Sequence, residues 1–276
     1  MFKKLKTCFV SSLVLTSICV LMYVSCVLFA FDTPIAYFSA NSPLPYIAKY
    51  LLIFSSVGVG ALFFLIPKGS IPCPTPPQHS IYSRISSAVI AVCLLISIIL
   101  RFSISSNGYL QPTKLFFACA GLASLATIFY LMTAISPHSQ SAKRAILQVA
   151  AILWAASAMT EAYTNPYVTM NSPFKILLLL SMMSIMFFSL YEARFLITRP
   201  YPRAYAVSVL VGTCLSSVFS VSFLVMQLSG KYSIIEFLPT AIVSLAFSVY
   251  EFCRALDFLR HLSSEESSQN TVPDNI

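Results

Sequence analysis

Charged residues are scarce in this sequence, and their scarcity excludes an ordinary soluble fold. Only 9% of the 276 residues are charged, whereas 58% are hydrophobic. A soluble domain typically carries about 25% charged residues on its surface. We therefore expect the chain to be embedded in a lipid bilayer.

The residue types that build metal, haem and phosphate sites are also few. The three histidines, His79, His138 and His261, fall outside the apolar segments, and the sequence has no HExxH and no glycine-rich phosphate loop. Asp32 and Asp257 are expected at or beyond the membrane surface, which disfavours an intramembrane aspartate pair. We expect no enzyme, no cofactor and no metal site.

The cysteines and the positive charge have simple interpretations in a membrane protein. Seven of the eight cysteines lie within or at the ends of apolar runs, and no CxxC is present, which favours free thiols packed as small apolar residues. The 17 lysines and arginines lie almost wholly at the ends of those runs. Their placement indicates membrane topology and anionic lipid headgroups rather than nucleic acid.

Eight apolar segments are long enough to cross a bilayer, for which about 20 residues are needed. They cover residues 8–31, 46–66, 85–102, 113–135, 145–162, 174–197, 204–229 and 236–259. The first is about 24 residues long, which predicts a retained anchor helix rather than a signal peptide. The predicted fold is an all-α integral membrane protein: a polytopic bundle of eight transmembrane helices over residues 1–260, followed by a disordered polar tail over residues 261–276.

The distribution of basic residues predicts the orientation of the chain. With these eight spans, twelve lysines and arginines lie on the side of the N-terminus and five on the other side. Basic residues accumulate on the cytoplasmic side of membrane proteins. We therefore expect both termini in the cytoplasm and the protein in the plasma membrane.

A recurring sequence indicates internal repetition. Residues 188–192 (FSLYE) return as residues 247–251 (FSVYE), and each copy ends an apolar run. Arg84, Arg144 and Arg203, at spacings of 60 and 59 residues, each open a predicted span. The pattern favours tandem hairpin repeats of about 60 residues, a common arrangement in membrane proteins.

The ends of the two copies supply the candidate site for a cation or solute, because ionisable groups in membrane segments are expensive and mark function. The candidate residues are Glu192, Glu251, Tyr191, Tyr250, Arg194 and Arg254. The alternative interpretation is an interfacial anchor, in which the arginines reach lipid headgroups and the tyrosines join the aromatic belt. Glu161 is expected at the opposite membrane interface.

Small residues at helical spacing predict the faces where helices pack, since close approach of helices is favoured in lipid. The candidate faces are Ser208, Gly212, Ser216 and Ser220 in the seventh span and Ala151, Ala155 and Ala158 in the fifth.

Two functions are consistent with these features. The first is a non-enzymatic scaffold, accessory or sensor component that packs with membrane lipids, a membrane protein partner or a second copy of itself, and that binds no nucleic acid. The second is a small-solute or ion permease that uses the membrane-embedded Glu192 and Glu251. A permease requires that these glutamates face the interior of the bundle, whereas anchors face the headgroups.

Overall fold

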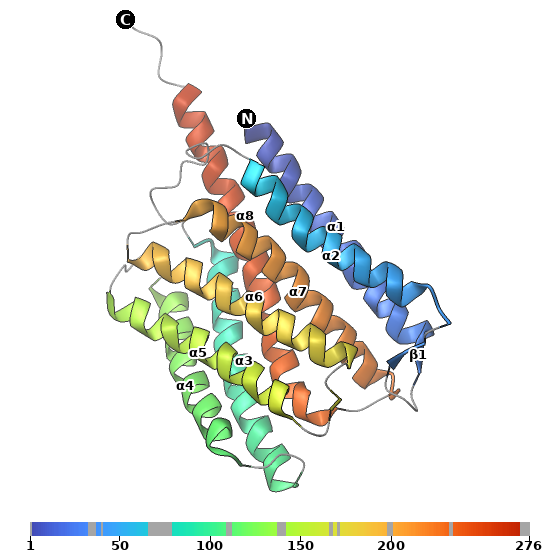
Figure 1. Ribbon diagram of the computed structural model, residues 1–276. Helices are drawn as coiled ribbons and strands as arrows, with labels where there is room; N and C mark the ends of the chain where they lie inside the picture. Colours follow the sequence, from blue (N-terminus) through green and yellow to red (C-terminus); the bar gives the residue numbers. More distant parts are fainter. Residues whose placement is uncertain are drawn as a thin grey trace, which may run out of the picture.

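The computed structural model describes residues 2–32, 37–39, 41–65, 79–108, 112–136, 142–165, 168–169, 172–197, 201–231 and 234–270. These residues are almost entirely helical (Figure 1). The elements are α1 (Phe2–Phe29), β1 (Phe31–Asp32), β2 (Tyr37–Phe38), α2 (Leu44–Leu65), α3 (Ile81–Ser106), α4 (Lys114–Ile135), α5 (Ala142–Thr164), α6 (Pro173–Leu196), α7 (Pro202–Leu228), the 3-10 turn η1 (Ile235–Phe237) and α8 (Leu238–Asn270).

Eight helices in the described part of the chain are long and apolar enough to cross a membrane. Each coincides with one of the segments expected from the sequence, from Lys6–Phe29 at the beginning to Ile235–His261 at the end. The prediction of an all-helical chain with eight membrane-spanning lengths is therefore confirmed. The arrangement fits a multi-pass membrane protein.

The ends of three helices show how local sequence sets their bounds. Helix α3 begins at Ile81, because the Ser80 hydroxyl accepts a hydrogen bond from the Ser83 N–H and caps the helix. Helix α6 begins with Pro173 in its first turn, as the sequence predicted. Helix α8 continues to Asn270, so the first part of the tail that was expected to be disordered is helical. An existing helix extends without a new nucleation cost, which explains this difference.

Six of the helices form a closed ring. Each helix from α3 to α7 contacts the next one in the sequence, and α8 returns to contact α3. The hairpin of α1 and α2, joined by the short β1–β2 pair, lies outside the ring and packs mainly against α7. Figure 1 shows this hairpin to one side of the other helices, with the beginning of α1 and the end of α8 at the same end of the bundle.

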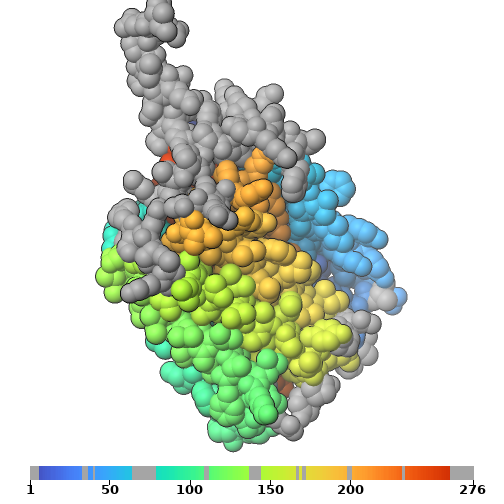
Figure 2. All heavy atoms as spheres, turned by 60° about the vertical axis from the view of Figure 1, so that its left-hand side comes forward, coloured from blue at the N-terminus to red at the C-terminus, as the bar shows by residue number. Residues whose placement is uncertain are grey.

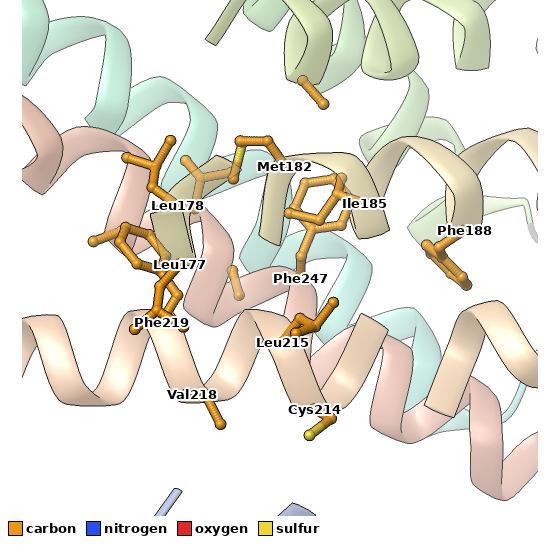
Figure 3. Close-up of a cluster of buried hydrophobic side chains, with 14 of the residues drawn as sticks. Leu177, Leu178, Met182, Ile185, Phe188, Cys214, Leu215, Val218, Phe219 and Phe247 are labelled. Atoms are coloured by element: carbon orange, nitrogen blue, oxygen red, sulfur yellow. The ribbon is translucent and has the colours of Figure 1, made fainter. Parts of the chain in front are cut away.

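The interior of the ring is filled by side chains of α6, α7 and α8 (Figure 3). The residues that meet there are Leu177, Leu178, Met182, Ile185 and Phe188 of α6, Cys214, Leu215, Val218 and Phe219 of α7, and Phe247 of α8. The Phe247 ring stacks on Trp154 of α5 with 6.0 Å between centroids. It also meets the edge of Tyr130 from α4 at 5.4 Å. Phe247 of α8 thus connects α4 and α5 with the interior of the ring.

The two faces of small residues lie inside the protein. All seven of their members are buried: Ser208, Gly212, Ser216, Ser220, Ala151, Ala155 and Ala158. The Ser181 and Ser244 hydroxyls are 2.6 Å apart, and Ser244 donates to the Ser216 carbonyl at 3.4 Å. These contacts connect α6, α7 and α8 at close range, as expected for helices that pack through small and hydroxylated residues.

Replacing Phe247 with alanine should strongly destabilise the bundle, because the change removes a fully buried ring with aromatic partners on two other helices. Comparable changes in soluble cores cost about 3–5 kcal/mol. Phe252→Ala on the same helix is the matched control, since Phe252 is 39% exposed. Thermal unfolding in one detergent should show a clearly lower midpoint for Phe247→Ala. Equal midpoints in the two variants would contradict the packing described here.

Candidate functional site

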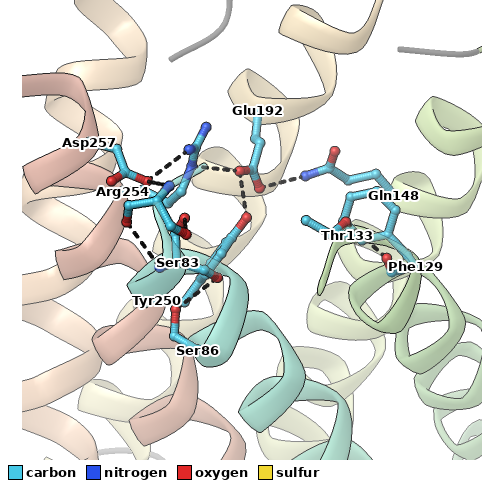
Figure 4. Close-up of polar contacts among 10 residues, drawn as sticks. Ser83, Ser86, Phe129, Thr133, Gln148, Glu192, Tyr250, Arg254 and Asp257 are labelled. Atoms are coloured by element: carbon cyan, nitrogen blue, oxygen red, sulfur yellow. Dashed lines mark hydrogen bonds and ion pairs between the residues drawn. The ribbon is translucent and has the colours of Figure 1, made fainter. Parts of the chain in front are cut away.

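A buried polar cluster lies where α5, α6 and α8 meet the beginning of α3 (Figure 4). Its members are Gln148 of α5, Glu192 of α6, and Tyr250, Arg254 and Asp257 of α8. All five side chains are at most 5% exposed. Two helices, α6 and α8, therefore bring charged groups into the interior of the protein, and α5 adds a neutral amide.

Glu192 is the centre of this polar cluster and accepts three hydrogen bonds. The Tyr250 hydroxyl donates to Glu192 Oε1 at 2.8 Å, and Arg254 Nε donates to the same oxygen at 3.2 Å. Gln148 Nε2 donates to Glu192 Oε2 at 3.0 Å. A buried carboxylate requires such partners to offset its lost hydration. Glu192 has both an opposite charge and neutral donors.

Arg254 connects Glu192 with a second acid. Its Nη1 donates to Asp257 Oδ2 at 3.3 Å, one turn further along α8. The same Asp257 oxygen accepts the N–H of Ser80, the capping residue of α3, at 3.2 Å. A carboxylate at a helix N-terminus is favoured by the helix dipole. Asp257 was expected beyond the membrane, but it closes this network inside the protein.

Glu251 is buried differently, because it faces α7 and has no hydrogen-bond partner. It is fully buried, and neither carboxylate oxygen makes a hydrogen bond within the described part of the chain. A Cβ atom placed on Gly212 would lie 2.5 Å from Glu251 Oε1, so any larger residue there would require the Glu251 carboxylate to move. The Ser216 hydroxyl lies near enough to be a potential donor to this carboxylate, and the negative charge of Glu192 lies near enough to repel it.

Other polar atoms near the two glutamates also have unused hydrogen-bonding capacity. Tyr130 Oη, Gln148 Oε1 and Ser189 Oγ are buried and, among the described residues, have no hydrogen-bond partner. Tyr130 lies close enough to Ser189, Glu192 and Glu251 to interact with all three. Oxygen atoms from four helices thus converge on the space between the carboxylates. Oxygen donors of this kind suit a proton or a hard cation.

The charges of the site are unequal. Arg254 pairs with the carboxylates of Glu192 and Asp257, whereas neither Glu251 oxygen has a hydrogen-bond partner among the described residues. In the parts of the chain that the structure describes, no three His, Cys, Asp or Glu side chains form a group that could hold a metal ion. The arrangement is suited to a single proton or small cation, bound by carboxylate and hydroxyl oxygens.

The structure divides the six candidate residues of the sequence analysis. Glu192, Glu251, Tyr250 and Arg254 gather in the interior. Tyr191 is only half-buried, and the Arg194 guanidinium lies over the Tyr201 ring at 4.8 Å from its centroid. The interfacial-anchor interpretation therefore fits Tyr191 and Arg194 but not the other four residues.

Helical spacing explains why the two arginines differ. Arg254 follows Glu251 by three residues and Tyr250 by four, so all three share one side of α8. Arg194 follows Glu192 by only two residues, which places it on the opposite side of α6. One additional residue in the second copy thus turns its arginine inward.

A second buried ion pair was missed by the sequence analysis. Arg101 Nη1 of α3 lies 2.5 Å from Glu161 Oε2 of α5, and Arg101 Nη2 donates to the Thr240 hydroxyl of α8 at 3.5 Å. Arg101 is 4% exposed, although both it and Glu161 were expected at the membrane interface. The pair lies near the ends of α3 and α5 opposite to the polar cluster. The sequence separates the partners by 60 residues, so no local pattern reveals them.

The chain shows no similarity to known proteins in three comparisons. No protein-family model matches it, and neither the curated proteins nor the solved structures contain a match. Function is therefore inferred from the geometry of the site.

The two glutamates should respond oppositely to substitution. Glu192→Gln leaves the Arg254 guanidinium with one fewer buried counter-charge, and breaking a buried ion pair typically costs about 3–5 kcal/mol. Glu251→Gln removes a carboxylate that has no hydrogen bond in the described structure and should leave the unfolding midpoint unchanged or higher. Thermal unfolding of both variants in detergent tests this difference. A larger loss in Glu251→Gln than in Glu192→Gln would contradict the assignment of partners.

Proposed function

We propose that the protein is a small-solute or ion permease in which Glu251 binds a proton or a small cation. The observation that carries the proposal is the position of Glu251: fully buried, against Gly212, without a hydrogen bond in the described structure. An ionised carboxylate in such a place has lost its hydration and gained no partner. A proton or cation bound to the Glu251 carboxylate neutralises its charge and offsets the lost hydration.

The neighbouring Glu192 supports this division of roles. Its charge is offset by Arg254 and by the hydroxyl of Tyr250, so Glu192 holds the helices together. Its negative charge also acts on Glu251 and adds to the attraction for a cation. A structural acid beside an uncompensated acid is expected where one group maintains the site and the other exchanges its ligand.

The surrounding rings define the class of ligand. Tyr130 packs edge-on against Tyr250 at 5.7 Å between centroids, and Phe247 stacks on Trp154. Aromatic faces attract cations, and ammonium groups in particular. The site favours a proton, a monovalent metal ion or a small amine, and it disfavours anions.

Ion pairs near opposite ends of the ring suggest how access to the site is controlled. The Glu192–Arg254 pair closes one end of the ring and the Arg101–Glu161 pair closes the other. Alternating access requires that one end opens while the other stays shut. Breaking one pair at a time would expose Glu251 to one side only.

The proposal includes the place and threading of the protein. We place it in the plasma membrane with both termini in the cytoplasm, because that orientation puts most of the basic residues inside. The hairpins α3–α4, α5–α6 and α7–α8 are proposed to be tandem repeats. Arg84, Arg144 and Arg203 each lie in the first turn of the first helix of a hairpin, which supports this repetition.

The orientation predicts the behaviour of reporters fused after Ile276. A fluorescent protein that matures only in the cytoplasm should fluoresce, and a phosphatase that folds only outside should be inactive, since the C-terminus stays inside. The same pair fused after Ser136, between α4 and α5, should also report the cytoplasm. An active phosphatase at either position would refute the threading.

Glu251→Gln should abolish ligand-coupled transport while leaving the fold intact, because glutamine keeps the shape of the neutral acid but cannot exchange a proton. Purified protein is reconstituted into liposomes that contain a pH-sensitive dye, and proton flux is driven by a potassium diffusion potential, with sodium, potassium or methylammonium present in turn. We expect flux at least tenfold lower in Glu251→Gln than in the wild type, which corresponds to about 1.4 kcal/mol or more. Glu236→Gln, a carboxylate outside the site, is the control.

Equal flux in wild type and Glu251→Gln would overturn the permease proposal. The second candidate is then a scaffold or accessory component, favoured by the α1–α2 hairpin, which contacts little besides α7 and exposes large apolar side chains such as Val14, Leu21 and Phe54. Crosslinking in membranes should in that case capture a discrete partner or a second copy through this hairpin.

A further inference from the structure

A groove outside the polar cluster runs between α2, α6 and α7. It has a volume of about 240 Å³, and its walls include Phe63 of α2, Phe187 and Tyr191 of α6, and Val207 and Val211 of α7. Figure 2 shows α2, α6 and the first turns of α7 meeting on this face of the molecule. The groove is partly open to the surroundings of the bundle, and neither Glu192 nor Glu251 lines it.

The groove is apolar along its length and positively charged at one end. Arg203 lines it in the first turn of α7, and its Nη2 atom is buried without a hydrogen-bond partner among the described residues. The N-terminus of a helix is itself favourable for an anion. The guanidinium and the first turn of α7 therefore offer a phosphate-sized anion two sources of attraction at the same end.

The length of the groove matches one leaflet of a bilayer. From Arg203 to Val211 the helix rises eight residues, or about 12 Å. Half of a hydrocarbon core of about 30 Å is about 15 Å. A headgroup held at Arg203 would thus leave its acyl chain beside Val207 and Val211. Tyr191 lies at the same end, where tyrosine side chains meet lipid headgroups.

We propose that this groove binds one anionic phospholipid, with its phosphate at Arg203 and one acyl chain between α2, α6 and α7. Charge complementarity at Arg203 selects an anionic headgroup, and the apolar walls select the chain. The proposal concerns a different surface from the cation site and does not depend on permease activity. A protein partner is the competing occupant that the experiment excludes or reveals.

The test compares lipids on the purified, delipidated protein in a neutral detergent. Phosphatidylglycerol and phosphatidylcholine with identical acyl chains are titrated separately, and binding is followed by the unfolding midpoint and by native mass spectrometry. We expect phosphatidylglycerol to bind better in the wild type. Arg203→Gln should weaken its binding roughly tenfold, the scale of a lost charge-assisted hydrogen bond, and leave phosphatidylcholine unaffected.

Two further variants separate the headgroup from the chain. Arg194→Gln is the matched control, because Arg194 lies near the same end of α6 but stacks on Tyr201 and does not line the groove. It should keep the preference for phosphatidylglycerol. Val207→Trp should fill the groove and weaken both lipids; Val211→Phe serves the same purpose if that variant fails to fold by circular dichroism.

Several results would overturn the proposal. Equal binding of the two lipids would remove the role of Arg203, and an equal loss in Arg194→Gln would indicate diffuse surface charge. A shift of the same size with glycerol phosphate would show an anion site without an acyl chain. If the folded Val207→Trp or Val211→Phe variant binds lipid as the wild type does, the lipid does not occupy the groove. If a protein copurifies with the wild type and is lost from that variant, the groove binds a protein instead. Proton flux is measured in Arg203→Gln as well, so that failure of the lipid proposal can be distinguished from failure of the permease proposal.

Discussion

The packing of this bundle depends on compensating a guanidinium that lies in its interior. Arg254 has no access to water or to lipid headgroups, so its charge must be met by protein groups. Glu192 and Asp257 meet it from α6 and from the next turn of α8, and Asp257 in turn caps α3 through Ser80. One cation thereby links α6, α8 and the beginning of α3, where 62 residues separate Glu192 from Arg254 and 177 separate Ser80 from Asp257. Apolar packing alone would let these helices slide, because lipid competes equally for their surfaces.

Glu251 differs from Arg254, because its buried carboxylate is not met by an opposite charge or a hydrogen bond among the described residues. The fold makes room for its carboxylate with glycine at position 212, yet neither carboxylate oxygen makes a hydrogen bond in the described structure, and the nearby Ser216 hydroxyl is a potential donor. A purely structural site would favour a donor there, or an apolar residue, since an unsatisfied buried acid lowers stability. A buried carboxylate that has room but no hydrogen-bond partner is expected where a ligand binds to it and is released again.

The sequence could predict the elements of this structure better than their contacts. Apolar length and terminal signals such as Pro173 define the helices, because a bilayer imposes one span length on every segment. That Glu251 and Arg254 share one side of a helix was also accessible from their spacing, but whether that side faces the interior was not. The pairing of Arg101 with Glu161, or the contact of Gly212 with Glu251, was not accessible. Each depends on how two helices are rotated about their axes, which is set by packing of the whole ring.

The cation site and the lipid groove use opposite sides of the same two helices. On α6, Glu192 faces the interior while the adjacent Tyr191 lines the groove; on α7, Gly212 contacts Glu251 while the adjacent Val211 lines the groove. Any rotation of α6 or α7 that loosens the contact between Gly212 and Glu251 must also change the width of the groove. If the proposed site binds a cation and the groove binds a lipid, a lipid that prefers one width would bias the state of the cation site. By linkage, a bound cation would then change the affinity for that lipid by the same factor.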